Sequence, residues 1–282
     1  MEKIKLLPLD LKCIEEVWSF LKPQEAYCVQ LCERLEEFVD KGKSNGNFIC
    51  FVEKQLLGVI FVSNAGMVLH SLGEFSDDQR LVVKKLLGDY FANRKVYCIS
   101  GKKTGTTLIC EAIISSKNTR PVEIRDYNLM IFDSKFKNNI FFPVKKCNLE
   151  DLDKLLFIQS EYDKIEVLPA TYSFDEKLCK KKLFFSLQKE RVFAIDIGSE
   201  NFVAKASINA KSSRYTQIGG VYTDNTYRGK GYAATLVNYI ATNASNIGQR
   251  VVLFVRKDNI PAIRSYTKAG FKSQDSYGIV YF

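Results

Sequence analysis

Hydrophobic and polar positions follow two kinds of pattern in the first half of the chain. Apolar side chains recur every three or four residues over 9–21 and 24–39, which predicts two amphipathic helices. Short runs rich in β-branched and aromatic residues predict strands. The expected strands are 48–53, 56–63, 67–72, 96–100 and 122–132, with further helices over 77–92 and 104–114. This pattern predicts a mixed α/β structure.

The same order of elements recurs in the second half. Helices are expected after the capping signals at Asn148 and Ser173, and a glycine-bearing turn follows the last strand of a meander. The expected strands are 141–144, 191–197, 201–209, 215–223 and 251–255, and a last helix starts at Pro261. At 282 residues the chain is long enough for two ordinary domains. We place these domains at 1–141 and 142–282.

Composition is that of a globular protein outside the membrane. Hydrophobic residues make up 46% of the chain and charged residues 26%, and no apolar run approaches the ~20 residues that cross a bilayer. The eight cysteines include no CxxC pair and there is one histidine, so we expect no metal site. The first residues lack the apolar core of a signal peptide, and we expect a cytoplasmic protein with reduced cysteines.

The net charge of +9 is concentrated in the second half. Residues from 143 onward hold 21 Lys and Arg against 14 Asp and Glu, whereas the first 142 hold 20 against 18. This excess suits a polyanionic ligand, but a generally basic surface explains it equally well. Charge alone does not decide between them.

The most informative stretch runs from Gln217 to Tyr239. A strand leads into a turn with the sequence Arg228-Gly229-Lys230-Gly231-Tyr232-Ala233, and an apolar helix follows. Glycines let the backbone turn sharply, and N–H groups at a helix start lack intrahelical partners and favour an anion. The spacing is neither that of a dinucleotide-binding fingerprint nor that of a P-loop. The stretch therefore predicts a phosphate-binding turn of another kind.

The pattern R-x-x-G-x-A at 228–233 resembles the pyrophosphate-binding signature of the GNAT superfamily of acyl-CoA N-acyltransferases. A second block, Asn259-Ile260-Pro261-Ala262-Ile263-Arg264-Ser265-Tyr266 and then Ala269-Gly270-Phe271, resembles the family's N-x-x-A-x-x-x-Y-x-x-x-G-F helix. The resemblance covers 142–282, and its motifs are specific over 217–271. It implies an α/β (α+β) fold with two GNAT-like domains, each a mixed, mostly antiparallel twisted sheet flanked by helices.

The resemblance also implies acetyl-CoA as the acyl donor. The pantetheine arm would lie along the strand before the turn, and Tyr266 would act as the catalytic acid that protonates the departing thiolate. Asn259 would hold the pantetheine, cap the helix, or do both, and Thr235 is either a phosphate ligand or an ordinary helix residue. The implied cofactor-binding residues are Val221, Tyr222, Thr223, Arg228, Gly229, Lys230, Gly231, Tyr232, Ala233 and Asn259.

The first half lacks the phosphate-binding turn. Where it should stand, residues 71–76 offer one glycine and an acidic residue, Glu74, which would repel a pyrophosphate. We interpret 1–141 as a degenerate GNAT-like domain that keeps the fold and has lost cofactor binding. An unrelated α/β module with the same element order is the alternative. His70, on an expected strand, is assigned a structural or surface role rather than a catalytic one.

The reaction implied is direct transfer of an acetyl group from acetyl-CoA to a primary amine, on a small molecule or a peptide. Glu161, Glu166, Asp224 or a water would accept the amine proton, and the sequence does not separate them. A tandem-GNAT aminoacyl transferase and a non-catalytic acyl-CoA-binding sensor or scaffold are the alternatives. We expect no membrane or nucleic-acid partner, and a monomer or homodimer.

Overall fold

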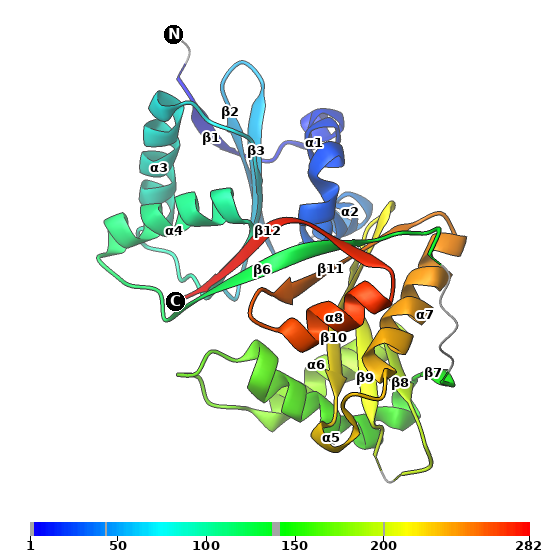
Figure 1. Ribbon diagram of the computed structural model, residues 1–282. Coiled ribbons are helices and arrows are strands. Elements are labelled where there is room, and N and C mark those ends of the chain that lie inside the picture. Colours follow the sequence, from blue (N-terminus) through cyan, green and yellow to red (C-terminus); the bar gives the residue numbers. More distant parts are fainter. Residues whose placement is uncertain (1–2, 43, 137–141, 200) are drawn as a thin grey trace. The chain divides into compact units, whose positions relative to one another are not determined.

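The computed structural model describes residues 3–42, 44–136, 142–199 and 201–282 (Figure 1). Its contacts divide the chain into two units, Met1–Asn128 with Asp275–Phe282, and Leu129–Gln274. The expected domain boundary at 141/142 lies at the end of residues 137–141, which are outside the described part of the chain. The first residue of the expected strand 141–144 is outside it as well. The fold is mixed α/β, strand pairing is mostly antiparallel and helices flank the strands, as predicted from the sequence.

The first unit follows the predicted order of helices and strands. Its elements are β1 (Lys5–Pro8), α1 (Ile14–Leu21), α2 (Val29–Lys41), β2 (Gly46–Val52), β3 (Leu56–Ser63), β4 (Met67–Leu72), α3 (Asp77–Phe91), β5 (Cys98–Lys102), α4 (Lys103–Lys117) and β6 (Glu123–Phe132), which runs on into the second unit. Strands β2, β3 and β4 form an antiparallel meander, and β5 runs parallel to β4. The short edge strand β1, antiparallel to β2, is not evident from the sequence pattern.

Helices cover both faces of the first unit's sheet. Helices α3 and α4 pack over a core that includes Phe51, Leu87 and Ile99, and α1 and α2 pack over a core on the other face (Figure 1). The predicted capping box opens α3, because Ser76 Oγ accepts from the N–H of Gln79 at 3.3 Å and Gln79 Oε1 accepts from the N–H of Ser76 at 3.1 Å. These layers are what the amphipathic patterns predict.

The last strand of the chain belongs partly to the first unit. Strand β12 (Phe271–Tyr281) pairs antiparallel with β5 over Tyr277–Tyr281. Within the same unit, Tyr277 Oη lies 2.5 Å from Ser100 Oγ, and the Tyr27 hydroxyl donates to Asp275 at 2.7 Å. The order of elements along the chain does not reveal this arrangement.

The second unit repeats this order of helices and strands. Its elements are β7 (Val144–Lys146), α5 (Leu152–Tyr162), a π-helical segment (Asp163–Val167), α6 (Glu176–Gln188), β8 (Val192–Ile195), β9 (Ala204–Lys211), β10 (Tyr215–Thr223), α7 (Tyr232–Asn246), β11 (Arg250–Arg256) and α8 (Ile260–Lys268). Strands β7 to β10 are antiparallel, and β10 pairs parallel with β11. Helices α7 and α8 pack on one core cluster, and α5 and α6 on another.

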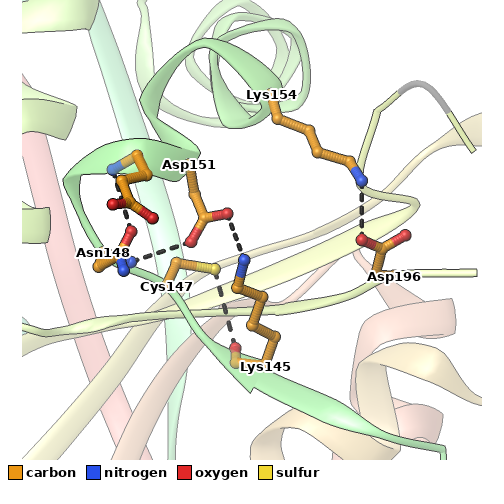
Figure 2. A network of polar contacts seen from close by, with 7 residues as sticks. Lys145, Cys147, Asn148, Asp151, Lys154 and Asp196 are labelled. Atoms are coloured by element: carbon orange, nitrogen blue, oxygen red, sulfur yellow. Dashed lines mark hydrogen bonds and ion pairs between the residues drawn. The ribbon is translucent and has the colours of Figure 1, made fainter. Parts of the chain in front are cut away.

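Polar contacts fix the 3-10 turn Leu149–Asp151 that leads into α5, as Figure 2 shows. Asn148 Oδ1 accepts from the N–H of Glu150 at 2.9 Å, and Asp151 Oδ2 accepts from the N–H of Asn148 at 3.0 Å. Lys145 of β7 pairs with Asp151 at 2.5 Å. The predicted cap at Asn148 is confirmed, and it caps the 3-10 turn that precedes α5. The predicted cap at Ser173 is wrong: Asp175 caps α6 by accepting from the N–H of Leu178 at 3.0 Å, because its carboxylate stands one residue before the helix.

Two further properties bear on function. No helix within the described ranges is long and apolar enough to cross a membrane. In the same ranges, no group of three or more His, Cys, Asp or Glu side chains is placed to hold a metal ion.

Candidate active site

The turn before α7 has the backbone conformation that its glycines allow. Gly229 and Gly231 have φ values of 79° and 90°, in the left-handed region that L side chains rarely adopt. Among the described residues, none beyond the chain neighbours has an atom within 4 Å of a Cβ built at either position. Gly231 is the N-cap of α7 and no side chain caps the helix there. Because no side chain caps the helix, the N–H groups of its first turn can bind an acceptor from outside the chain.

The cations of the motif stay beside this turn. The Arg228 guanidinium donates from Nε to the Thr223 carbonyl at 3.3 Å and lies 5.5 Å from the centre of the Tyr222 ring. Lys230 Nζ lies 5.1 Å from the centre of the Tyr227 ring. Both side chains are exposed and add positive charge to the helix start.

The first residues of α7 differ in exposure. Tyr232 is buried, its ring 4.6 Å from that of Phe142, so only its backbone faces the turn. Ala233 is half-buried. Thr235 is buried, and its hydroxyl makes no hydrogen bond within the described residues. A buried hydroxyl does not meet a phosphate without a side-chain movement.

Strand β10 leaves its neighbour before it reaches the turn. The parallel register of β10 with β11 ends at Ile218, paired with Leu253. On its other edge β10 continues along β9, with a bulge between Gly219 and Tyr222. The predicted pantetheine-binding segment, Val221 to Thr223, lies beyond the end of the β11 pairing. An extended amide chain can add to such a strand edge.

Helix α8 begins as predicted and carries the predicted acid. Asn259 Oδ1 accepts from the N–H of Ala262 at 3.1 Å, which confirms its capping role. Tyr266 is 7% exposed, and its pKa is raised by burial and by the charge of Glu166. Its phenol therefore keeps its proton at neutral pH, as a catalytic acid must.

The three carboxylates considered as bases have different surroundings. Glu166, in the π-helical segment after α5, accepts from Asn259 Nδ2 at 3.4 Å and acts electrostatically on Tyr266. Glu161 pairs with Lys164 at 2.9 Å. Asp224 caps the 3-10 turn Asn225–Tyr227 by accepting from the N–H of Thr226 at 3.0 Å. Glu166 is thus the carboxylate that the fold brings to the motif helix.

Sequence reasoning missed Lys205. This lysine of β9 is 0% exposed, donates from Nζ to the Gly220 carbonyl at 2.9 Å, and lies 4.8 Å from the centre of the Tyr162 ring. Burial lowers its pKa to about 8, against the opposing effect of Asp163. The sequence signal that could have revealed it is a lysine inside the apolar run Val203-Ala204-Lys205-Ala206.

With this geometry in view, known proteins give a consistent picture. The sequence model of the acetyltransferase (GNAT) family matches residues 158–271. The second unit carries a GNAT domain. The match includes the turn at 228–233, Tyr266 and Lys205, so the site described above lies within the GNAT region.

Solved structures resemble the whole chain at low sequence identity. A GNAT-family acetyltransferase from Colwellia psychrerythraea is 13% identical, with 99% of each chain covered and a TM-score of 0.59. A GCN5-related N-acetyltransferase from Sphaerobacter thermophilus is 13% identical over 98% of this chain and 94% of that one, with a TM-score of 0.62. A tandem GNAT protein from the clavulanic acid biosynthesis pathway is 10% identical over 99% and 98%, with a TM-score of 0.56. At these identities the likeness concerns the fold. No curated protein matches the sequence.

Proposed function

We propose that the second unit transfers an acetyl group from acetyl-CoA to a primary amine by direct attack. The observation that carries this proposal is the open backbone turn at the start of α7, next to a strand whose pairing with β11 ends at Ile218. Together they place an anion-binding turn directly after a segment of β10 that does not pair with β11. A long ligand with a pyrophosphate at one end and amides along its arm matches that arrangement.

The binding residues follow from this arrangement. The N–H groups from Gly229 to Ala233 would hold the pyrophosphate, with Arg228 and Lys230 adding charge. The edge of β10 at Val221 to Thr223 would hold the pantetheine amides. When bound, the thioester supplies an activated acyl group, and the chain's own residues polarise it and manage the protons.

Three groups of the chain would act in the reaction. The Val221 N–H would polarise the thioester carbonyl. As the C–N bond forms and the C–S bond breaks, Tyr266 would give its proton to the sulfur and Glu166 would take the amine proton, directly or through a water. Returning that proton from Glu166 to Tyr266 restores the site. The contact of Glu166 with Asn259 and its effect on Tyr266 support this pairing.

We propose further that the first unit binds no acyl-CoA. There the pairing of β4 with β5 ends at Leu69, opposite Ser100, and His70 lies just beyond. The His70 ring takes the space that glycines leave, since a Cβ at Gly101 or Gly105 would lie 2.3 Å or 2.6 Å from its atoms. A buried imidazole thus lies just beyond the end of the β4–β5 pairing. In the second unit, the pantetheine would lie at the corresponding position, beyond the end of the β10–β11 pairing.

Calorimetric titration with acetyl-CoA tests the proposal on the wild type and two matched variants, Gly231→Glu and Gly248→Glu. Both glycines have positive φ, 90° and 82°, with open space around them, and they lie at opposite ends of α7. Backbone strain is therefore similar, and only Gly231→Glu puts a carboxylate at the turn. We expect one site per chain, with binding weakened at least about a hundredfold by Gly231→Glu, or ~2.7 kcal/mol, and unchanged by Gly248→Glu.

The same titration has outcomes that would contradict these proposals. Two sites per chain would refute the assignment of a single site to the second unit. Equal loss in both variants would point to strain rather than charge. No binding by the wild type would refute the acetyltransferase proposal. After binding, a panel of small amines and peptides, with CoA release followed by chromatography, identifies the acceptor class.

A further inference from the structure

Lys205 is a cation placed wholly inside the second unit. Its side chain is 0% exposed, and its Nζ donates to a backbone carbonyl, that of Gly220, at 2.9 Å. A buried ammonium is costly unless it meets an acceptor. The carbonyl it meets belongs to the bulge of β10, the strand that we propose binds the acyl donor.

The bulge turns one peptide of β10 away from regular pairing. Gly219 pairs with Ser207 and Tyr222 with Lys205, so Gly220 and Val221 face a single residue of β9. Gly220 has φ 59°, and a Cβ there would lie 3.1 Å from Lys205 Nζ, so glycine suits both the backbone and the close approach. The Gly220 carbonyl, no longer part of a regular ladder, takes the lysine as its donor.

The geometry of the peptide bond relates the Lys205 contact to the direction of the Val221 N–H. The peptide between Gly220 and Val221 is planar and trans, since no cis bond occurs in the described chain. In a trans peptide the C=O and the N–H point in opposite directions. Holding the Gly220 carbonyl toward Lys205 therefore directs the Val221 N–H away from Lys205.

We propose that Lys205 is a positioning residue, which holds the Gly220–Val221 peptide so that the Val221 N–H meets the thioester carbonyl of the acyl donor. This inference rests on the proposed acetyl-CoA function and adds a residue to it. Lys205 touches neither substrate nor reacting atoms. Its ammonium binds the carbonyl end of the peptide whose N–H does the polarising.

The groups around Lys205 define its pH behaviour. Tyr162 of α5, Asp163 of the π-helical segment, Cys179 of α6 and Cys147 after β7 act on it. Burial raises the pKa of Cys147 to about 12 and that of Cys179 to about 11, so both thiols stay neutral below about pH 10. Lys205, with a pKa of about 8, is the group of this cluster that changes charge between about pH 7 and 9.

The test uses the full chain and acetyl-CoA labelled with ¹³C at the acetyl carbonyl, with the bound carbonyl stretch read by isotope-edited infrared spectroscopy. The variants are Lys205→Met, which removes the donor, and Lys205→Gln, which keeps a neutral N–H donor. Lys154→Met is the control, because the Lys154 ammonium, in the same unit, pairs with the Asp196 carboxylate at 2.7 Å (Figure 2) and not with the Gly220 carbonyl. Binding is measured in parallel by calorimetry with acetyl-CoA and with CoA, which lacks the carbonyl.

We expect the wild type and Lys154→Met to lower the bound carbonyl frequency relative to free acetyl-CoA. In Lys205→Met that shift should be lost and the affinity for acetyl-CoA should fall about three- to tenfold, the worth of one hydrogen bond, while CoA binding is unchanged. Lys205→Gln should recover part of the shift. In the wild type the shift should weaken as pH rises through about 8, and in Lys205→Gln it should not change over that range.

Each other outcome overturns the inference in a different way. A wild-type carbonyl shift in Lys205→Met shows that the peptide is held without the ammonium. The same conclusion follows if Lys205→Gln gives the full carbonyl shift and the wild-type shift does not change with pH. A wild type that binds acetyl-CoA without shifting its carbonyl refutes the role of Val221 and with it that of Lys205. A wild type that binds no acetyl-CoA refutes the proposed function itself. If Lys205→Met does not fold, Lys205→Gln and the wild-type pH series decide.

Discussion

His70 should make the first unit lose stability as pH falls from 7 to 5. The imidazole is 2% exposed, and its Nε2 lies 2.9 Å from Thr106 Oγ1. Its Nδ1 is buried with no hydrogen-bond partner within the described residues. Protonation would create a charged ring with a donor that has nothing to bind. Burial accordingly lowers the pKa of His70 from 6.5 to about 3.

The magnitude follows from proton linkage. Between pH 3 and 6.5 the unfolded chain binds more protons at His70 than the folded chain, so the free energy of unfolding decreases as pH falls through that window. With pKa values of 6.5 unfolded and about 3 folded, the loss between pH 7 and pH 5 is about 2 kcal/mol. A folded value one unit higher changes this figure little, because pH 5 still lies above it.

Urea unfolding at both pH values measures this loss, followed by tryptophan fluorescence. Trp18, the single tryptophan, lies in α1 of the first unit and packs against its core, so its fluorescence reports on this unit. The variant His70→Gln keeps a hydrogen-bonding group beside Thr106 and does not titrate. We expect the wild type to lose about 2 kcal/mol between pH 7 and 5 and the variant to lose less than about 0.5 kcal/mol.

Carboxylates that titrate at lower pH affect the wild type and His70→Gln equally. Asp133, Glu190 and Asp196 have pKa values lowered by lysine partners, so their contributions fade below about pH 4 and are shared by both proteins. Equal losses in the wild type and His70→Gln would refute the reasoning. It would mean that the folded protein accommodates a charged imidazole, by admitting water or by turning the ring to a new partner.

Two further predictions concern the proposed chemistry. Tyr266→Phe should lower kcat about a hundredfold with acetyl-CoA affinity within about threefold of wild type, because the buried phenol gives a proton and adds little binding; an unchanged kcat, in stopped-assay kinetics, would exclude the acid role. Glu166→Gln should lower kcat about a hundredfold, whereas Glu161→Gln, which removes the pair with Lys164, should leave kcat unchanged; the reverse pattern would assign the base to Glu161.

Local chemistry made several features of both units predictable. Positive φ at Gly229 and Gly231, the cap at Asn259 and the capping box at Ser76 depend on residues within four positions of one another. Such signals act before any long-range contact forms, so the pattern of residues indicates them directly. The cap expected at Ser173 failed for a local reason too, since Asp175 is the better-placed competitor.

Long-range placement was not predictable. Glu166 and Asn259 are 93 residues apart in sequence, and their contact separates Glu166 from Glu161 and Asp224, which residue type alone did not. Pairing of the final strand with β5 likewise joins segments that no local pattern connects. Register and contact between distant segments depend on the packing of the whole unit.

The amino-acid sequence by itself therefore determined the α/β element order, the glycine turn at 228–233 and the helix that carries Tyr266, because short-range backbone and capping preferences dictate them. Only the tertiary structure decided that Lys205 is buried against the Gly220 carbonyl, that His70 stands where the β4–β5 pairing ends, and that Glu166 lies beside α8. Burial and the neighbours of a charge arise when distant segments pack together, and they control what an ionisable side chain can do.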